Sequence, residues 1–147
     1  MSRAEDFVEL MGRHLEEEGM PRIAGRLMGA LLLNEDATSL DDLAEQLQVS
    51  KGSISSNARL LEHWGVAERI TLPGDRRDFY RLSPSAEERS LQRTLDRHRL
   101  MLERLEVGRE VAADNERIKR RFESLMTFVS QAIRYLEEAI DCRKRPS

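Results

Sequence analysis

Apolar residues recur at helical spacing in two short stretches, and a serine stands immediately before each of them. Serine is a preferred N-cap, because its hydroxyl accepts a hydrogen bond from a backbone N–H of the first helical turn. Ser39 and Ser50 therefore predict the starts of two helices joined by a tight turn. The buried stripes of these helices are expected to hold Leu40, Leu43, Ala44 and Leu47 in the first and Ile54, Ala58 and Leu61 in the second.

Two strands are predicted after the second helix. That helix is expected to run to about Trp64, because Gly65 suits the left-handed position that follows a helix end. β-branched and aromatic residues then mark strands at Val66 to Thr71 and at Phe79 to Leu82. The turn-forming residues Leu72 to Asp75 join the strands into a hairpin.

A pair of arginines, Arg76 and Arg77, is expected at the tip of this hairpin. Helix, turn, helix and hairpin in this order predict a winged helix-turn-helix, which presents its second helix to a DNA groove. A basic tip beside that helix suits the minor groove or the flanking phosphates. The alternative is a solubilising loop in which Asp75 and Asp78 pair with the arginines.

The second helix carries small and polar residues on the face opposite its buried stripe. Small residues allow close approach to a major groove, serines reach phosphates or base edges, and Arg59 suits a phosphate or a guanine. Asn57 lies toward one flank of this face. An ordinary solvated helix surface is the alternative interpretation. The predicted DNA-binding residues are Ser50, Lys51, Gly52, Ser53, Ser56, Asn57, Arg59, Arg76 and Arg77.

The distribution of charge gives mild support to DNA binding by the segment that holds the second helix and the hairpin. Between residues 50 and 82, six Lys or Arg side chains stand against four Asp or Glu, which gives +2 in a chain whose formal net charge is −3. The remainder of the chain therefore sums to −5. Basic charge is concentrated where DNA would bind.

The segment Ser39 to Leu82 resembles the winged-helix domain of MarR-type transcriptional regulators. The run GMPRIAGRLMGALLL, Gly19 to Leu33, resembles the GbsR-like branch of that group, some of whose members regulate osmoprotectant genes. The resemblance implies transcriptional regulation, expected as repression, by a dimer on a palindromic promoter site. Choline-responsive members imply an effector, but the few aromatic residues show no cluster for a cationic ligand, so the effector is left open. A pocket is expected between the winged helix and the dimer helices.

The N-terminal stretch predicts two further helices. The first is amphipathic, with Phe7, Leu10 and Met11 on its apolar face and His14 and Leu15 continuing it. Gly19 ends it and Pro21 opens the second helix. The small pair Gly25 and Gly29 in that helix predicts close packing against a neighbouring helix.

Beyond Ala86, apolar residues alternate in steps of four and three, a heptad pattern in two blocks. The blocks hold Leu91, Leu95, His98, Leu102 and Leu105, and, after Gly108, Val111, Asn115, Ile118, Phe122, Leu125, Val129, Ala132, Leu136 and Ala139. An apolar seam of this length needs a partner, which predicts a homodimer. The alternative is a monomeric hairpin of the two blocks. A hairpin with a single seam would not bury the other apolar residues beside that seam, which favours the dimer. These residues are Met101, Met126, Phe128, Ile133 and Ile140.

These patterns predict a mainly α fold with a small β-wing, in which long terminal helices serve dimerisation. The expected parts are an N-terminal helix for dimerisation or packing at residues 1–18, the winged helix-turn-helix at 19–83, and the long helices at 84–147. At 147 residues the chain is large enough for a hydrophobic core.

Enzyme chemistry finds little support in the sequence. The three histidines lie in separate helical segments, and a single cysteine makes no metal-ligand spacing. We therefore expect no catalytic residues, no metal and no cofactor. Neither a membrane-spanning apolar run nor the apolar core of a signal peptide is present, so cytoplasmic residence is expected.

The expected function is thus DNA-binding transcriptional regulation. One alternative is a winged helix that mediates protein interaction or dimerisation without a specific DNA site, but its exposed face should display an apolar or aromatic anchor. Another is a thiol redox-sensing regulator in which Arg143, Lys144 and Arg145 favour the thiolate of Cys142. A lone cysteine near a chain end is more often inert, which is the default expectation.

Overall fold

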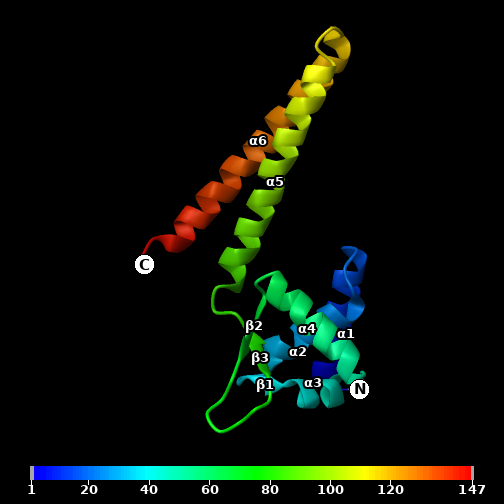
Figure 1. Ribbon diagram of the computed structural model, residues 1–147, viewed down its shortest axis with the longest axis vertical. Coiled ribbons are helices and arrows are strands. Elements are labelled where there is room, and N and C mark those ends of the chain that lie inside the picture. Colours follow the sequence, from blue (N-terminus) through cyan, green and yellow to red (C-terminus); the bar gives the residue numbers. More distant parts are fainter. Residues whose placement is uncertain (1, 147) are drawn as a thin grey trace. The chain divides into compact units, whose positions relative to one another are not determined.

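The computed structural model describes residues 2–146 and divides them into two compact units, the first ending at Ala86 and the second beginning at Glu87. Figure 1 shows the order of the elements. The first unit contains α1 (Arg3–Glu17), α2 (Arg22–Leu33), β1 (Thr38–Ser39), α3 (Leu40–Leu47), α4 (Lys51–His63), β2 (Ala67–Ile70) and β3 (Phe79–Leu82). The long helices are α5 (Ala86–Val111) and α6 (Glu116–Lys144).

Both helices of the helix-turn-helix begin at the predicted serines. The Ser39 hydroxyl accepts from the backbone N–H of Asp42 at 3.1 Å, and the Ser50 hydroxyl accepts from that of Ser53 at 3.1 Å. Each bond satisfies an N–H that the helix itself leaves without a partner. The turn between the helices passes through Gln48, whose φ of 53° places it in the left-handed region.

The predicted end of α4 is also confirmed. His63 is the last helical residue, Trp64 is the C-cap, and Gly65 follows with a φ of 77°. The backbone N–H of Val66 donates to the carbonyl of Leu61 at 2.9 Å, and that of Gly65 donates to the carbonyl of Glu62 at 3.0 Å. This pair of bonds is the Schellman motif, which satisfies two carbonyls at the helix end and turns the chain toward β2.

The core of the first unit lies beneath α4. Ile54, Ala58 and Leu61, the predicted stripe, are all fully buried. They join Leu27 of α2 and Leu43 of α3 in one hydrophobic cluster. Because the buried stripe of α4 points into this cluster, its opposite face is left at the surface.

The small sheet has three strands in the order β1-β3-β2, with both pairings antiparallel. β2 and β3 form the predicted hairpin, in which Ala67 lies opposite Leu82 and Ile70 opposite Phe79. β1 was not predicted from the sequence. It is only two residues long and pairs with β3.

The glycines of α2 confirm the predicted close packing, and α1 supplies the neighbouring helix. A Cβ added at Gly25 would lie 2.3 Å from the carbonyl oxygen of Met11, which leaves room for no side chain. The predicted apolar face of α1 is partly wrong. Val8 and Leu15 are buried, whereas Leu10 is 55% exposed, because α2 packs against a face turned away from Leu10.

α5 and α6 lie side by side and run in opposite directions (Figure 1), with one hydrophobic cluster between them. The two heptad blocks of one chain therefore pack against each other as a helical hairpin, the arrangement given above as the alternative. The buried members of this cluster are Leu95, Leu105, Val129, Ile133 and Ile140, with Leu91, Leu102, Phe122, Met126 and Leu136 packed against them.

The predicted break between the two heptad blocks was placed too early. α5 continues through Gly108, where a Cβ would lie 2.3 Å from Cε1 of Phe122, so this glycine serves helix packing and not chain reversal. The reversal falls at residues 112–115, and Asn115 caps α6 through its side-chain oxygen. Val111, predicted in the second seam, ends α5 and is 85% exposed.

Among residues 2–146, none of the helices is both long and apolar enough to cross a membrane.

Candidate nucleic-acid interface

The N-terminal turn of α4 is built from small residues around a serine cap. The Ser50 hydroxyl contacts both the backbone N–H and the hydroxyl of Ser53, each at 3.1 Å. Gly52 follows with an exposed backbone, and a Cβ added there would meet only the Ser50 hydroxyl, at 4.0 Å. The fold therefore has room for a side chain at this position and leaves it empty.

The exposed face of α4 brings several of the predicted residues together. Gly52, Ser56 and Arg59 are exposed, and Ser53 is half-buried beside them. Lys51 lies at the start of the helix, where its ammonium pairs with Asp41 of α3 at 3.0 Å. No large apolar side chain of α4 is exposed on this face.

Asn57 points back onto its own helix. Its side-chain amide nitrogen donates to the backbone carbonyl of Ser53 at 2.8 Å, and its side-chain oxygen is buried without a hydrogen-bond partner among the described residues. An adenine contact by Asn57 requires this side chain to leave its intrahelical bond. Asn57 is therefore not arranged together with the exposed residues of α4.

The hairpin tip, which we call the wing tip and define as residues 71–78, holds its two arginines differently. Arg77 pairs with Asp75, whose carboxylate accepts from the Arg77 side chain at 2.8 to 3.2 Å and from its backbone N–H at 2.9 Å. The Arg77 guanidinium also lies 5.2 Å from the ring centre of Phe79. Hydrogen bonding from Arg77 lowers the pKa of Asp75 to about 2. Arg76 is exposed.

Most of the Lys and Arg side chains between residues 50 and 82 make ion pairs. Arg69 pairs with Asp78 and Arg81 with Glu68, in addition to the pairs of Lys51 and Arg77 described above. Within residues 2–146, Arg59 and Arg76 are the two basic side chains of the segment that make no ion pair. One lies on the exposed face of α4 and the other on the wing tip.

α4 and the hairpin are joined by a partly buried hydrogen bond that the sequence did not predict. The Tyr80 hydroxyl on β3 donates to the Glu62 carboxylate in the last turn of α4 at 3.1 Å. Tyr80 is only 2% exposed. Burial, together with the bond to Glu62, raises the pKa of Tyr80 to about 12.

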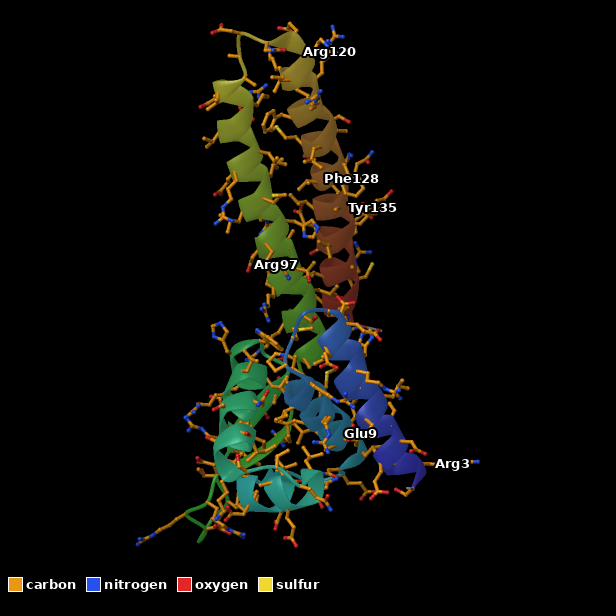
Figure 2. The ribbon with its side chains drawn as sticks, turned by 90° about the vertical axis from the view of Figure 1, so that its right-hand side faces the viewer. Arg3, Glu9, Arg97, Arg120, Phe128 and Tyr135 are labelled. Atoms are coloured by element: carbon orange, nitrogen blue, oxygen red, sulfur yellow. The ribbon has the colours of Figure 1, made fainter. Side chains whose placement is uncertain are left out.

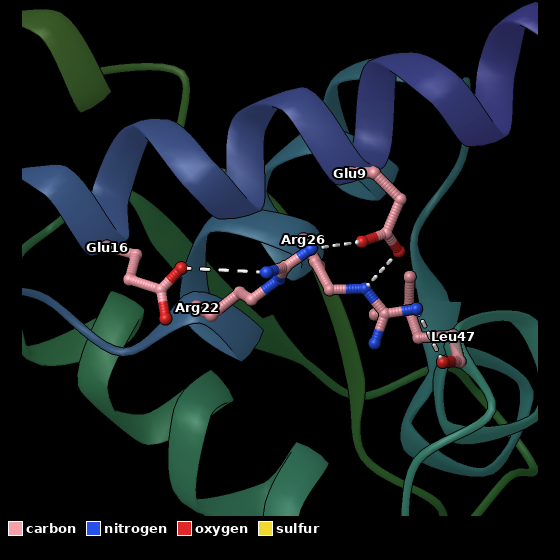
Figure 3. Close-up of polar contacts among 5 residues, drawn as sticks. All are labelled: Glu9, Glu16, Arg22, Arg26 and Leu47. Atoms are coloured by element: carbon pink, nitrogen blue, oxygen red, sulfur yellow. Dashed lines mark hydrogen bonds and ion pairs between the residues drawn. The ribbon is translucent and has the colours of Figure 1, made fainter.

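A second unpredicted contact fixes the turn between α3 and α4 (Figure 3). Arg26 of α2 donates to the backbone carbonyl of Leu47 at 2.9 Å and to the Glu9 carboxylate of α1 at 2.7 Å. Arg22 donates to the other oxygen of Glu9 at 3.0 Å. Hydrogen bonding and positive charge from these arginines lower the pKa of Glu9. The sequence did contain a signal for this contact. Arg22 and Arg26 are four residues apart on one predicted helix, so they share a face that can pair with Glu9 on the preceding helix.

Cys142 is an exposed free thiol on α6. Two of its basic neighbours are engaged elsewhere, since Arg143 pairs with Glu87 and Lys144 with Glu88 of α5. The cationic surroundings on which the redox alternative depends are therefore largely neutralised.

Comparisons with known proteins agree with this geometry. A model of the MarR family matches residues 18–78. The HTH-type transcriptional regulator MmpR5 of Mycobacterium tuberculosis is 45% identical over 82 residues, which are 55% of this chain and 50% of that protein. The putative HTH-type transcriptional regulator YvaV of Bacillus subtilis is 31% identical over 81 residues, 54% of this chain and 46% of that protein. The chain thus spans about half the length of the curated relatives it matches.

A crystal structure described as that of a transcriptional regulator has the same fold along almost the whole chain. It covers 99% of this chain and 100% of its own, with 29% identity and a TM-score of 0.86. Fold and sequence together define a winged-helix protein. Within that class, residues 18–78 match the model of the MarR family, in agreement with the resemblance seen in the sequence.

Proposed function

We propose that this chain is a DNA-binding transcriptional regulator that acts as a dimer on a two-fold symmetric promoter site. The observation that carries the proposal is the exposed face of α4, where Gly52, Ser56 and Arg59 are presented without an apolar anchor. A helix enters the major groove with its N-terminal residues against base edges. The MarR-family winged helix supports the same function.

Glycine at position 52 supports this use of α4. Glycine in a helix costs roughly 0.5 to 1 kcal/mol relative to alanine. The space around Gly52 offers no packing reason for that cost, because an added Cβ would meet nothing closer than 4.0 Å. Close approach of a duplex is the reason we infer.

The distribution of unpaired cations supports two contacts with the duplex. Arg59 of α4 suits a base edge or a phosphate, and Arg76 of the wing suits the minor groove or a phosphate. The pairing of Arg77 with Asp75 and Phe79 holds the wing tip and leaves Arg76 as its free cation among the described residues. In this proposal α4 supplies sequence discrimination and Arg76 supplies salt-dependent affinity.

The dimer is supported by a second apolar stripe on α6. Leu125, Phe128 and Tyr135 share one helix face, and Phe128 and Tyr135 (Figure 2) are 66% and 72% exposed. The stripe packed against α5 uses other residues, among them Val129 and Ile133. A large exposed apolar surface marks an interaction site, and a dimer would space two recognition helices for a palindrome.

The finer assignments rest on resemblance. Repression as the mode of regulation is the expectation that the MarR-type resemblance carries, and membership of the GbsR-like branch is proposed from the run Gly19 to Leu33. In the structure this run forms α2 and its start, with the glycines packed against α1.

Fluorescence anisotropy with a selected duplex and a random one tests the proposal. Ser56→Ala and Arg59→Ala should each weaken binding to the selected duplex by about 1 to 3 kcal/mol if they read base edges, and binding to the random duplex by less. Lys51→Ala, at an ion-paired neighbouring position, serves as the matched control and should change the ratio of the two affinities little. Equal affinity of wild type for both duplexes contradicts the proposal and favours a protein-interaction module.

A further inference from the structure

The bond between Tyr80 and Glu62 joins the two surfaces that the proposed function assigns to DNA. Glu62 lies in the last turn of α4, and Tyr80 is the second residue of β3, the strand that follows the wing tip. Their side chains meet at 3.1 Å, with the phenol buried and the carboxylate partly buried. A hydrogen bond to an ionised acceptor is among the stronger ones that proteins form.

The base of the hairpin packs against α4, because Ala67 and Tyr80 share one hydrophobic cluster with Ile54 and Leu61. Apolar packing of this kind has no preferred direction. The chain passes from α4 to β2 through the glycine turn at Gly65, and the wing tip contains no regular element. The hairpin is anchored on one side by β1, which contributes only two residues. The phenol–carboxylate hydrogen bond runs directly from α4 to β3 and adds a directional contact to this packing.

The Tyr80 hydroxyl can donate to Glu62 at every physiological pH. Burial and the neighbouring carboxylate raise the pKa of Tyr80 to about 12, so the phenol keeps its proton and remains a donor throughout the physiological range. Asp78 and Arg69, which pair with each other, also act on Tyr80, in opposite directions.

We propose that Tyr80 and Glu62 are positioning residues that hold the wing at a fixed angle to α4, so that Arg76 and the exposed face of α4 engage one duplex together. This inference rests on the proposed function. A preorganised pair of contacts avoids the entropy cost of ordering the wing on binding. Without the bond, α4 still binds its groove, but the wing contact is largely lost.

A double-mutant cycle on the salt dependence of DNA binding tests the inference. The quantity measured is the slope of the logarithm of the DNA-binding constant against the logarithm of the salt concentration. In the wild-type background, Arg76→Ala should make this slope less steep by about 1.8, since each phosphate contact contributes about 0.9 and a dimer has two wings. Tyr80→Phe removes the hydroxyl and keeps the ring, and in this background Arg76→Ala should change the slope by almost nothing. As a control in the wild-type background, Glu62→Gln keeps an acceptor oxygen for the Tyr80 hydroxyl and should retain the wild-type effect of Arg76→Ala.

Loss of stability alone gives a different result. A merely destabilised protein loses active fraction, which changes the apparent affinity but leaves the slope and the effect of Arg76→Ala unchanged. If Tyr80→Phe does not fold, Glu62→Ala removes the acceptor from the partly exposed side and must reproduce the lost coupling. Equal slope changes on Arg76→Ala in both backgrounds overturn the inference and leave the proposed function standing. Wild type that binds no duplex fails the proposed function, and the inference fails with it.

Discussion

Asp75 and Arg77 close the wing tip on itself. The carboxylate of Asp75 accepts three hydrogen bonds from the Arg77 side chain and one from its backbone N–H, although both residues lie at the surface. The pair spans only two residues, so it stiffens the tip locally. This arrangement engages the charge of Arg77 within the tip, whereas Arg76 is exposed and makes no ion pair among the described residues.

The first prediction concerns the acidity of this pair. The pKa of Asp75 should be about 2, below its ordinary value of 3.8, because Arg77 hydrogen bonds to the charged carboxylate. A lowered native-state pKa means that the contribution to stability is present above pH 3.8 and is lost as the pH falls through about 2. Carbon-detected NMR titration should find this midpoint in wild type. In Arg77→Ala the midpoint should return toward 3.8, and an unshifted wild-type value refutes the pairing.

The second prediction contrasts Gly52, which has open space around it, with Gly25, which is packed against α1. Gly52→Ala should raise the free energy of unfolding by up to about 1 kcal/mol and should weaken DNA binding, because the position is open in the fold and close to the duplex. Gly25→Ala is the matched contrast. It should destabilise the protein by about 1 to 3 kcal/mol or more, because its Cβ would overlap the Met11 carbonyl. Denaturant unfolding measures both, and tighter DNA binding by Gly52→Ala would contradict the proposed approach.

The features predicted correctly from the sequence are local ones. Ser39 and Ser50 cap helices through backbone groups three residues away. Gly65 ends α4 through its own conformation. Such devices act within one turn of chain, so the residue types alone identify them.

The features that were missed depend on residues far apart in the sequence. β1 exists because Thr38 and Ser39 meet β3 some forty residues later. Gly108 resembled a helix break, but its role is set by Phe122 on the facing helix. The same reason explains why the bond from Tyr80 to Glu62 was not found, since no spacing rule connects these positions.

The third prediction tests the exposed stripe on α6. Phe128→Asp should raise the dimer dissociation constant roughly 100-fold or more, because burying an unpaired carboxylate in an apolar interface costs about 3 kcal/mol or more. Thr127→Asp introduces the same charge one residue away on a different helix face and should leave the dimer intact. Sedimentation equilibrium distinguishes these outcomes. A wild-type monomer at micromolar concentration excludes the interface.

The fourth prediction concerns the wing tip. Arg76→Ala should weaken binding to selected and random duplexes alike, because a phosphate or minor-groove contact of this kind carries little sequence information. Arg81→Ala is the control, since Arg81 is also an exposed arginine of the hairpin but is paired with Glu68. Anisotropy titrations at several salt concentrations should show reduced affinity for Arg76→Ala only. Full affinity of Arg76→Ala on both duplexes would remove the wing from the interface.

The most direct test of DNA recognition is selection of bound sequences from a random duplex pool by the purified wild-type protein. Two recognition helices related by a dimer axis predict an enriched palindrome with half-sites about one helical turn apart. The same selection with Arg59→Ala should lose preference at specific positions of each half-site. An unenriched pool, recovered at normal protein concentration and low salt, would contradict sequence-specific binding by α4 and with it the account of this chain as a promoter-binding regulator.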